Sequence, residues 1–200
     1  MQKEVNNRIF YRFVNDKYMD DMWEVGNDFI VDNNFESFAE SFFIEKPTLK
    51  YKDKYLFNLC DDAIKGKINK DDLIAIKQLI KAYLNNQPLN LREYILETIR
   101  REEFSNLISR AHCLFLFDKP SLKYWNDTLN NEKKTLFKLE VSGTAFCGHA
   151  CLLPQTGKNI YTQEYQARCY WQNKLQDNPY HITNDREYLF QGKVKVLKKY

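Results

Sequence analysis

The chain lacks any long apolar run, and the residues that mark special protein classes are scarce. Nowhere do 18 apolar residues follow one another, and no apolar stretch follows the charges of the first eight residues. A membrane-spanning helix needs about 20 apolar residues, so we expect neither a membrane span nor a cleavable signal peptide. Only 6 glycines and 5 prolines occur in 200 residues, without repeats or low-complexity segments. Collagen-like, linker-like and solenoid sequences are therefore excluded.

A large charge of one sign is also missing. The 30 Lys and Arg residues nearly balance the 27 Asp and Glu residues, for a net charge of +3, which neither requires nor excludes a polyanionic partner. The five cysteines are an odd number in a chain too large to need disulfides, so we expect a reducing, cytoplasmic location. Abundant are hydrophobic residues, at 44%, and aromatics, at 15%. Together with the length, they predict one well-packed domain over residues 1–200.

The first part of the chain begins as a strand and then becomes helical. Residues 9–14 are mostly apolar or aromatic, which predicts a short buried strand with Arg12 as its one charge. From about residue 18 to 104, apolar residues recur at helical spacing in two stripes that Gln87 and Pro88 separate. We therefore expect a helical insertion after the first strand.

Strand patterns return in the second half of the chain. Phe137, Leu139 and Val141 alternate with charged residues, which predicts a half-buried strand over 136–141. The other elements expected here are strands over 112–117 and 145–153, a helix from Asp118 to about Leu129, a helix over 162–174, and two closing strands over 188–190 and 194–197 joined by a turn. This order predicts an α+β fold with its helices grouped early.

Three short segments carry the candidate chemistry. The last one, from Asp185 to Leu197, places acidic residues at the mouth of a strand, where side chains can face a cleft. Together with the strand Phe10–Val14 and the segment Cys113–Asp118, it resembles the three-strand signature of ADP-ribosyltransferases, which break NAD at its nicotinamide bond. The resemblance implies an ART-like split β-sheet and NAD as the co-substrate.

The resemblance also implies roles for single residues. Glu187 falls at the catalytic glutamate of the last strand, and Tyr11 and Arg12 lie where the family has His or Arg on the first strand. Phe115 falls at the aromatic position that stacks on nicotinamide in the diphtheria-toxin-like branch. Asp185, two residues before the glutamate, takes the acceptor-orienting place of the cholera-toxin-like branch.

The chain departs from the cholera-toxin-like pattern around its second strand. That strand has no Ser-Thr-Ser, and Ser109 and Arg110 are the candidates for the missing phosphate or ribose contact. A Ser-Arg pair, an aromatic strand and a later Tyr-Trp pair, here Tyr170 and Trp171, also resemble an uncharacterised bacterial family.

Chemical reasoning explains why these residue types would be needed. Loss of nicotinamide leaves an oxocarbenium-like ribose, which the carboxylate of Glu187 would stabilise. The diphosphate of NAD needs a fork of donors, which favours the arginines Arg12 and Arg110 over lysine. Phe115 and Tyr11 would contact the nicotinamide ring.

The implied function is an NAD-dependent mono-ADP-ribosyltransferase that acts as a cytoplasmic toxin of a toxin–antitoxin or anti-phage system. The preferred acceptor is a nucleic acid, RNA or DNA, and the alternative acceptor is a protein. A neutralising antitoxin is an expected partner, whereas a membrane is not. The rival from another class is a non-catalytic NAD- or partner-binding module, since a fold can persist without activity.

Each candidate residue also has a purely structural alternative. Glu187 could be a surface acid at a strand start, and Arg12 a cation at a strand edge. Phe115 could belong to the core. Ser109 could be a turn residue and Arg110 a solvated cation.

Cys147, His149 and Cys151 share one face of an expected strand, and Cys169 could add a fourth donor. Paired ligands in the usual zinc sites are separated by about two to four residues within a turn, a different spacing. We therefore expect no metal, and a zinc-stabilised nucleic-acid-binding protein is a further alternative.

Overall fold

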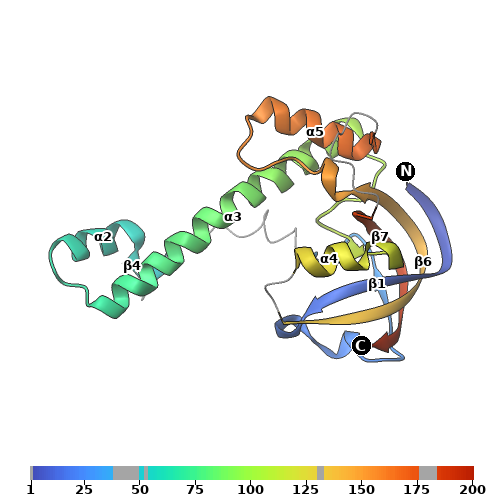
Figure 1. Cartoon of the computed structure of the whole chain (residues 1–200), viewed down its shortest axis with the longest axis horizontal. Coiled ribbons are helices and arrows are strands. Elements are labelled where there is room, and N and C mark those ends of the chain that lie inside the picture. The colour runs from blue at the N-terminus through green and yellow to red at the C-terminus, as the bar shows by residue number, and fades with distance from the viewer. Residues whose placement is uncertain (1, 38–49, 52–53, 130–132, 176–183) are drawn as a thin grey trace.

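The computed structural model describes residues 2–37, 50–51, 54–129, 133–175 and 184–200. The chain folds as an α+β protein, as its sequence predicts. An open antiparallel sheet carries helices against one face, and a helical arm extends from this body (Figure 1). Among the described residues, no helix is long and apolar enough to cross a membrane.

The main sheet of the described residues has five strands, and all of its pairs are antiparallel. The strands are β1 (Gln2–Asn15), β2 (Asp28–Val31), β5 (Leu114–Leu116), β6 (Lys134–His149) and β7 (Arg186–Lys199). The order is β1, β6, β7, β2, and β5 pairs with the first part of β7. A bridge between Tyr11 and Phe117 also joins β1 to the residue after β5, so the sheet curls back on itself.

The long strands β6 and β7 come very close together where two glycines face each other. Gly143 pairs with Gly192, and their φ angles are 154° and 142°. A Cβ atom on either glycine would collide with the backbone of the other strand, so the approach requires glycine. The sequence predicts a turn at Gln191 and Gly192 and a break between the strands over 136–141 and 145–153. Both predictions are wrong, because β6 and β7 are continuous and the two glycines mark a point where they come very close together.

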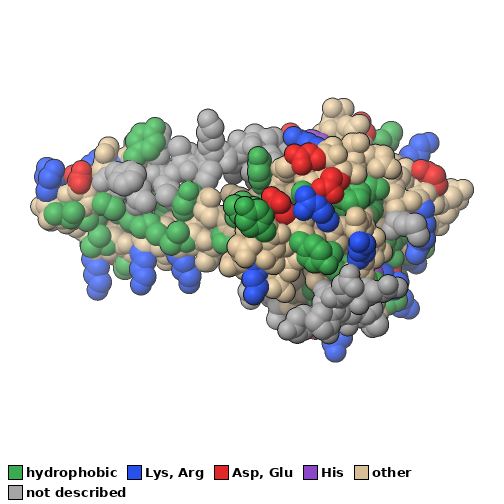
Figure 2. Space-filling model, turned by 90° about the horizontal axis from the view of Figure 1, so that it is seen from above, with side chains coloured by type: hydrophobic (Ala, Val, Ile, Leu, Met, Phe, Trp, Pro, Cys, Tyr) green, Lys and Arg blue, Asp and Glu red, His purple; other side chains and the backbone are tan. Residues whose placement is uncertain are grey.

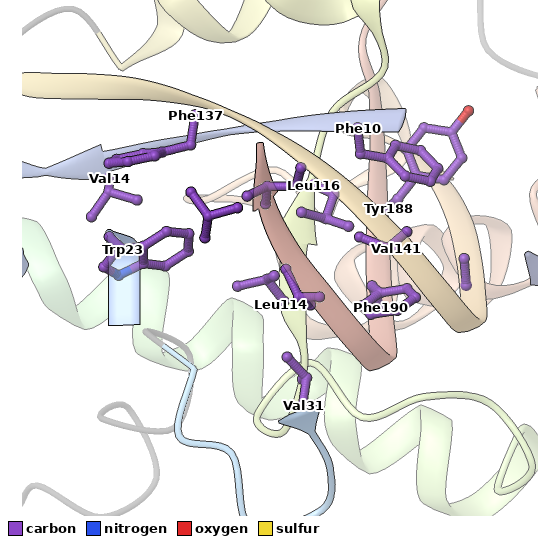
Figure 3. Close-up of a cluster of buried hydrophobic side chains, with 14 residues drawn as sticks. Phe10, Val14, Trp23, Val31, Leu114, Leu116, Phe137, Val141, Tyr188 and Phe190 are labelled. Carbon is purple, nitrogen blue, oxygen red and sulfur yellow. The ribbon is translucent and has the colours of Figure 1, made fainter. Parts of the chain in front are cut away.

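The inner face of the curled sheet holds one cluster of buried apolar side chains (Figure 3). Phe137, Leu139 and Val141 belong to it, with exposed fractions of 0%, 0% and 1%. Trp23, from the segment before β2, packs with its ring centroid 5.3 Å from that of Phe137. The alternation predicted for this strand is confirmed.

The outer face of the sheet is covered by α5 (Ile160–Gln172) and the C-terminal part of α3 (Lys70–Glu103). A second buried cluster forms there. It includes Leu96 and Ile99 of α3, Ala167, Tyr170 and Trp171 of α5, and Phe115, Phe146 and Leu189 of the sheet. Neighbouring residues of β7 divide between the faces, with Tyr188 inside and Leu189 outside.

α3 is one continuous helix of 34 residues with Pro88 inside it. The predicted break at Gln87 and Pro88 is therefore wrong, although proline usually ends or kinks a helix. Asn69 caps the start of the helix, since its side chain accepts a hydrogen bond from the amide of Asp72 at 2.8 Å. The other end is held by packing against the sheet and α5, and such packing overrides local preferences.

The first half of α3 extends beyond the sheet and forms the arm together with α2 (Leu56–Ile64), as Figure 1 shows. The stretch expected to be helical is only partly so, because β2 joins the sheet. Short strands β3 (Lys50–Tyr51) and β4 (Lys54–Tyr55) precede α2. In the second half of the chain, Asp118 caps a 3-10 turn that leads into α4 (Leu122–Thr128).

Candidate functional site

Glu187 is the second residue of β7 and points to the outer face of the sheet. Its neighbour Tyr188 belongs to the inner cluster, so the alternation of a strand sends Glu187 the other way. Only 2% of Glu187 is exposed. The structure thus places this residue in the interior, not at the surface.

Arg110 is the centre of a buried polar cluster on this face, and it is itself 2% exposed. Its Nη1 donates to Oε1 of Glu187 at 2.6 Å and to the hydroxyl of Tyr170 at 2.7 Å. Its Nε donates to Oε2 of Glu93 at 2.7 Å. The Tyr170 hydroxyl in turn donates to Oε1 of Glu187 at 2.7 Å. We call Glu93, Arg110, Tyr170 and Glu187 the Arg110 cluster.

In the Arg110 cluster, the opposite charges of Glu93 and Arg110 stabilise each other's ionised form. Burial would raise the pKa of Glu93, but the charges of Arg110 and Arg92 outweigh it and lower that pKa below its usual value. Burial would lower the pKa of Arg110, but Glu187 and Glu93 outweigh it and raise that pKa. Burial and the neighbouring Glu187 raise the pKa of Tyr170 despite Arg110. The tyrosine therefore stays a neutral donor beside a charged pair.

Sequence reasoning missed Glu93 as a site residue. It lies on α3 one helical turn before Leu96 and Glu97, all three of them buried. A glutamate at the spacing of an apolar stripe is the signal that could have revealed it. Tyr170 was noticed only as half of a Tyr-Trp pair, because its partners lie on other elements.

Phe115 and Tyr11, the predicted nicotinamide contacts, have different surroundings. Phe115 is buried in the outer cluster, and the guanidinium carbon of Arg110 lies 4.9 Å from its ring centroid. It is thus both a core residue and the aromatic partner of a cation. Tyr11 closes the sheet through its backbone, since its amide and carbonyl each bond Phe117 at 2.8 Å.

The side chain of Arg12 lies between β1 and β5. Nη1 of its guanidinium donates to the carbonyl of Phe115 at 2.8 Å, and Nε is buried without a partner. Within the described part of the chain, no carboxylate lies within ion-pair distance of Arg12. Burial lowers the pKa of Arg12 to about 10, and nearby Cys113 offsets only part of this effect. A partly buried guanidinium that pairs with no described acid is a candidate anion site.

The thiol of Cys113 donates a hydrogen bond to the backbone carbonyl of Arg110 at 3.5 Å. Burial raises the pKa of its thiol, and the charges of Arg110, Glu187 and Arg12 all act on it. Cys113 belongs to the outer cluster, whereas the guanidinium carbon of Arg12 lies 5.7 Å from the ring centroid of Trp23, a residue of the inner cluster.

Ser109 faces a different part of the surface. Its hydroxyl accepts a hydrogen bond from the amide of Ala111 at 3.2 Å, as in a serine turn. The side chain borders a hollow of about 560 Å³, whose lining also includes Arg100, Arg101 and His112. Neither Glu187 nor Arg12 lines this hollow.

Asp185 is fully buried, and both of its carboxylate oxygens are bonded. Oδ1 lies 2.7 Å from Nδ1 of His149, and Oδ2 accepts from the amide of Cys151 at 2.7 Å. An acceptor-orienting role would require the exchange of these bonds. Among the described residues, Cys147, His149 and Cys151 form no group that could hold a metal ion.

The Asp185 contacts predict a loss of stability in acid. Burial would raise the pKa of Asp185, but the hydrogen bonds from His149 and Cys151 outweigh it and lower that pKa. A depressed pKa contributes stability above the unfolded value of about 3.9, and this contribution disappears as the pH falls through the folded value. In urea denaturation, the free energy of unfolding of the wild type should fall below about pH 4, and in Asp185→Asn it should depend less on pH. An equal dependence of the unfolding free energy on pH in the two proteins would contradict this interpretation.

The structure brings Arg110, Glu187 and Phe115 together and adds Glu93 and Tyr170 to them. Arg12 meets this group at the carbonyl of Phe115, and its guanidinium lies over Trp23 of the inner cluster. Ser109 and Asp185 have separate surroundings.

Comparison with curated proteins finds no match to the chain. A family model does match, and it covers residues 10–200, which include both buried clusters and the whole sheet except the first part of β1. The chain therefore belongs to the family described as "Protein of unknown function (DUF2441)".

Proposed function

We propose that the chain is an NAD-dependent mono-ADP-ribosyltransferase whose acceptor is a nucleic acid. The observation that carries the proposal is the way in which hydrogen bonds fix the carboxylate of Glu187. Both the Arg110 and the Tyr170 hydrogen bonds end on its Oε1 atom, so neither occupies Oε2. A carboxylate fixed through one oxygen can present the other to a ribose hydroxyl.

This arrangement suits the chemistry of NAD cleavage. As nicotinamide leaves, the ribose gains positive charge, and a fixed carboxylate near its hydroxyls stabilises that charge. Arg110 pairs with Glu187 in the interior, and the hydrogen bond from Tyr170 restricts the orientation of the carboxylate. Both act on the substrate only through Glu187 and are positioning residues in this proposal.

The sparse backbone pairing between β1 and β5 supports an ART-like split sheet. The two strands are linked at the single described bridge between Tyr11 and Phe117, and the Arg12 side chain then takes the place of backbone pairing at the Phe115 carbonyl. Arg12 has donor capacity to spare there. The diphosphate of NAD would supply the anion that this guanidinium lacks among the described residues.

The burial of Glu187 favours a second candidate, a non-catalytic NAD- or partner-binding module. With 2% of the residue exposed, substrate can reach it only if the elements above the outer face shift. Buried ion pairs of this kind also occur as purely structural features. In that case Glu187 and Arg110 would only hold α3 and β7 together.

The acceptor can be tested with labelled NAD. Purified protein and NAD carrying a label in its adenosine half are added to a bacterial lysate, and the labelled products are digested separately with nuclease and protease. The proposal predicts one dominant labelled class that nuclease removes. Label that only protease removes would overturn the nucleic-acid acceptor and keep the transferase.

Arg12→Lys should weaken NAD binding by about tenfold or more, because a point charge replaces a planar fork that gives charge-assisted hydrogen bonds. Isothermal titration with NAD measures the effect. Arg8→Lys is the matched control, since the guanidinium of Arg8 lies over the ring of Phe10 on the same strand, whereas Nη1 of Arg12 bonds the Phe115 carbonyl of β5. Unchanged affinity of Arg12→Lys would show that this residue does not hold the diphosphate.

A further inference from the structure

The arm carries a row of lysines on α3, where Asp71 and Asp72 beside Lys70 are the only acids between Lys70 and Glu93 in the sequence. Lys70, Lys77 and Lys81 are exposed and follow one another at intervals of seven and four residues. These intervals bring their side chains to one side of a helix. Between Leu73 and Arg92 the chain contains no Asp or Glu. Figure 2 shows basic side chains spaced along one side of the arm, with apolar side chains among them.

The described fold does not use these charges. None of the three lysines takes part in an ion pair with a described residue. With a helical rise of about 1.5 Å per residue, the steps along the row are about 10 Å and 6 Å. Ile74 and Leu84 beside the row are 47% and 61% exposed. A row of ammonium groups matches the repeated negative charges of a phosphate backbone, and the aliphatic side chains beside the row can pack against unpaired bases.

The row leads toward the Arg110 cluster. Arg92 continues it on the same side of α3, about 33 Å from Lys70 along the helix. Nη2 of Arg92 bonds Oε1 of Glu93 at 2.9 Å, and Glu93 bonds Arg110. A nucleic-acid strand lying on the row would therefore reach Arg92, which bonds Glu93 of the Arg110 cluster.

We propose that Lys70, Lys77 and Lys81 bind the phosphate backbone of a single-stranded nucleic acid and lead it along α3 toward Glu187. The charge of the row selects this occupant, because a second copy of the arm would oppose lysine to lysine. The delivery of an acceptor to Glu187 rests on the proposed function. The binding itself does not.

The test uses the full chain without NAD and a fluorescein-labelled single-stranded RNA of about 20 nucleotides, long enough to span the row. Fluorescence anisotropy gives the affinity at several salt concentrations. The variant combines Lys70→Gln, Lys77→Gln and Lys81→Gln. The control removes equal charge from exposed positions of β7 with Lys193→Gln, Lys195→Gln and Lys199→Gln.

The arm variant should bind the RNA about tenfold more weakly at low salt. The slope of log K against log salt should shrink by about 2, because each lost phosphate contact removes about 0.7 on a single strand. The control should stay within about twofold of the wild type. Equal losses in the two variants, or tighter binding of duplex DNA than of RNA, would overturn the inference.

The arm proposal and the transferase proposal can be refuted independently of each other. RNA binding that depends on the arm, in a protein that never cleaves NAD, would keep the arm and refute the transferase. NAD cleavage by a protein that binds no RNA would refute the arm and keep the transferase.

Discussion

Arg110→Met should lower the free energy of unfolding by about 3–5 kcal/mol, because it leaves buried carboxylates without their cation. Glu93 and Glu187 are 1% and 2% exposed, and both bond Arg110. Methionine keeps much of the volume of the side chain, so the loss measures charge more than packing. Urea denaturation at neutral pH gives the value.

The matched control is Arg101→Met. Arg101 also pairs with a buried glutamate, Glu97, at 3.2 Å, but its own side chain is 69% exposed. Exposed ion pairs contribute about 0–1 kcal/mol, so the control should change little. If both variants lost the same small amount, the Arg110 cluster would not be the electrostatic centre that its geometry indicates.

Glu187→Gln should reduce the rate of NAD cleavage by about 10²–10³, since it removes the charge that meets the oxocarbenium-like ribose. The amide oxygen can still accept the hydrogen bonds of Tyr170 and Arg110. The fold should therefore survive, at a stability cost of about 1–3 kcal/mol. In bacteria, the wild type should arrest growth on induction and the variant should relieve that arrest.

Glu97→Gln separates chemistry from stability. Glu97 is 3% exposed and bonds Arg100 at 2.7 Å, so it is also a buried, paired glutamate, and it lies on α3, which covers the outer face of the sheet. Its loss should cost similar stability while leaving NAD cleavage at the wild-type rate. Equal loss of cleavage in both variants would mean that destabilisation, not chemistry, explains the Glu187 result.

The fold was predictable where the pattern is local. Alternation over Phe137, Leu139 and Val141 identified a strand face that packs in the core, since the period of two belongs to the strand itself. The close crossing at Gly143 and Gly192 and the continuous α3 could not be foreseen in this way. A glycine resembles a turn, and Pro88 resembles a helix end, until packing with distant elements overrides the local preference.

The sequence indicated Glu187, Phe115 and Arg110 as single candidates, but it did not indicate that Arg110 pairs with Glu187. Arg12 and Glu187 attracted attention because their charges accompany apolar strand patterns. Their partners come from far along the chain: Arg110 is separated from Glu93 by 17 residues and from Glu187 by 77. One sequence does not show which helix covers which face, so the buried state of Glu187 and the involvement of Glu93 could come only from the structure.

The release of nicotinamide from NAD by the purified chain tests the central claim most directly. Chromatographic separation of nicotinamide from NAD over a time course, with and without added RNA, measures it for the wild type, Glu187→Gln and Glu97→Gln. Release by the wild type and Glu97→Gln, reduced about 10²–10³ in Glu187→Gln, is the result predicted by the proposal. A folded wild-type protein that releases no nicotinamide under either condition would contradict it and favour the non-catalytic module.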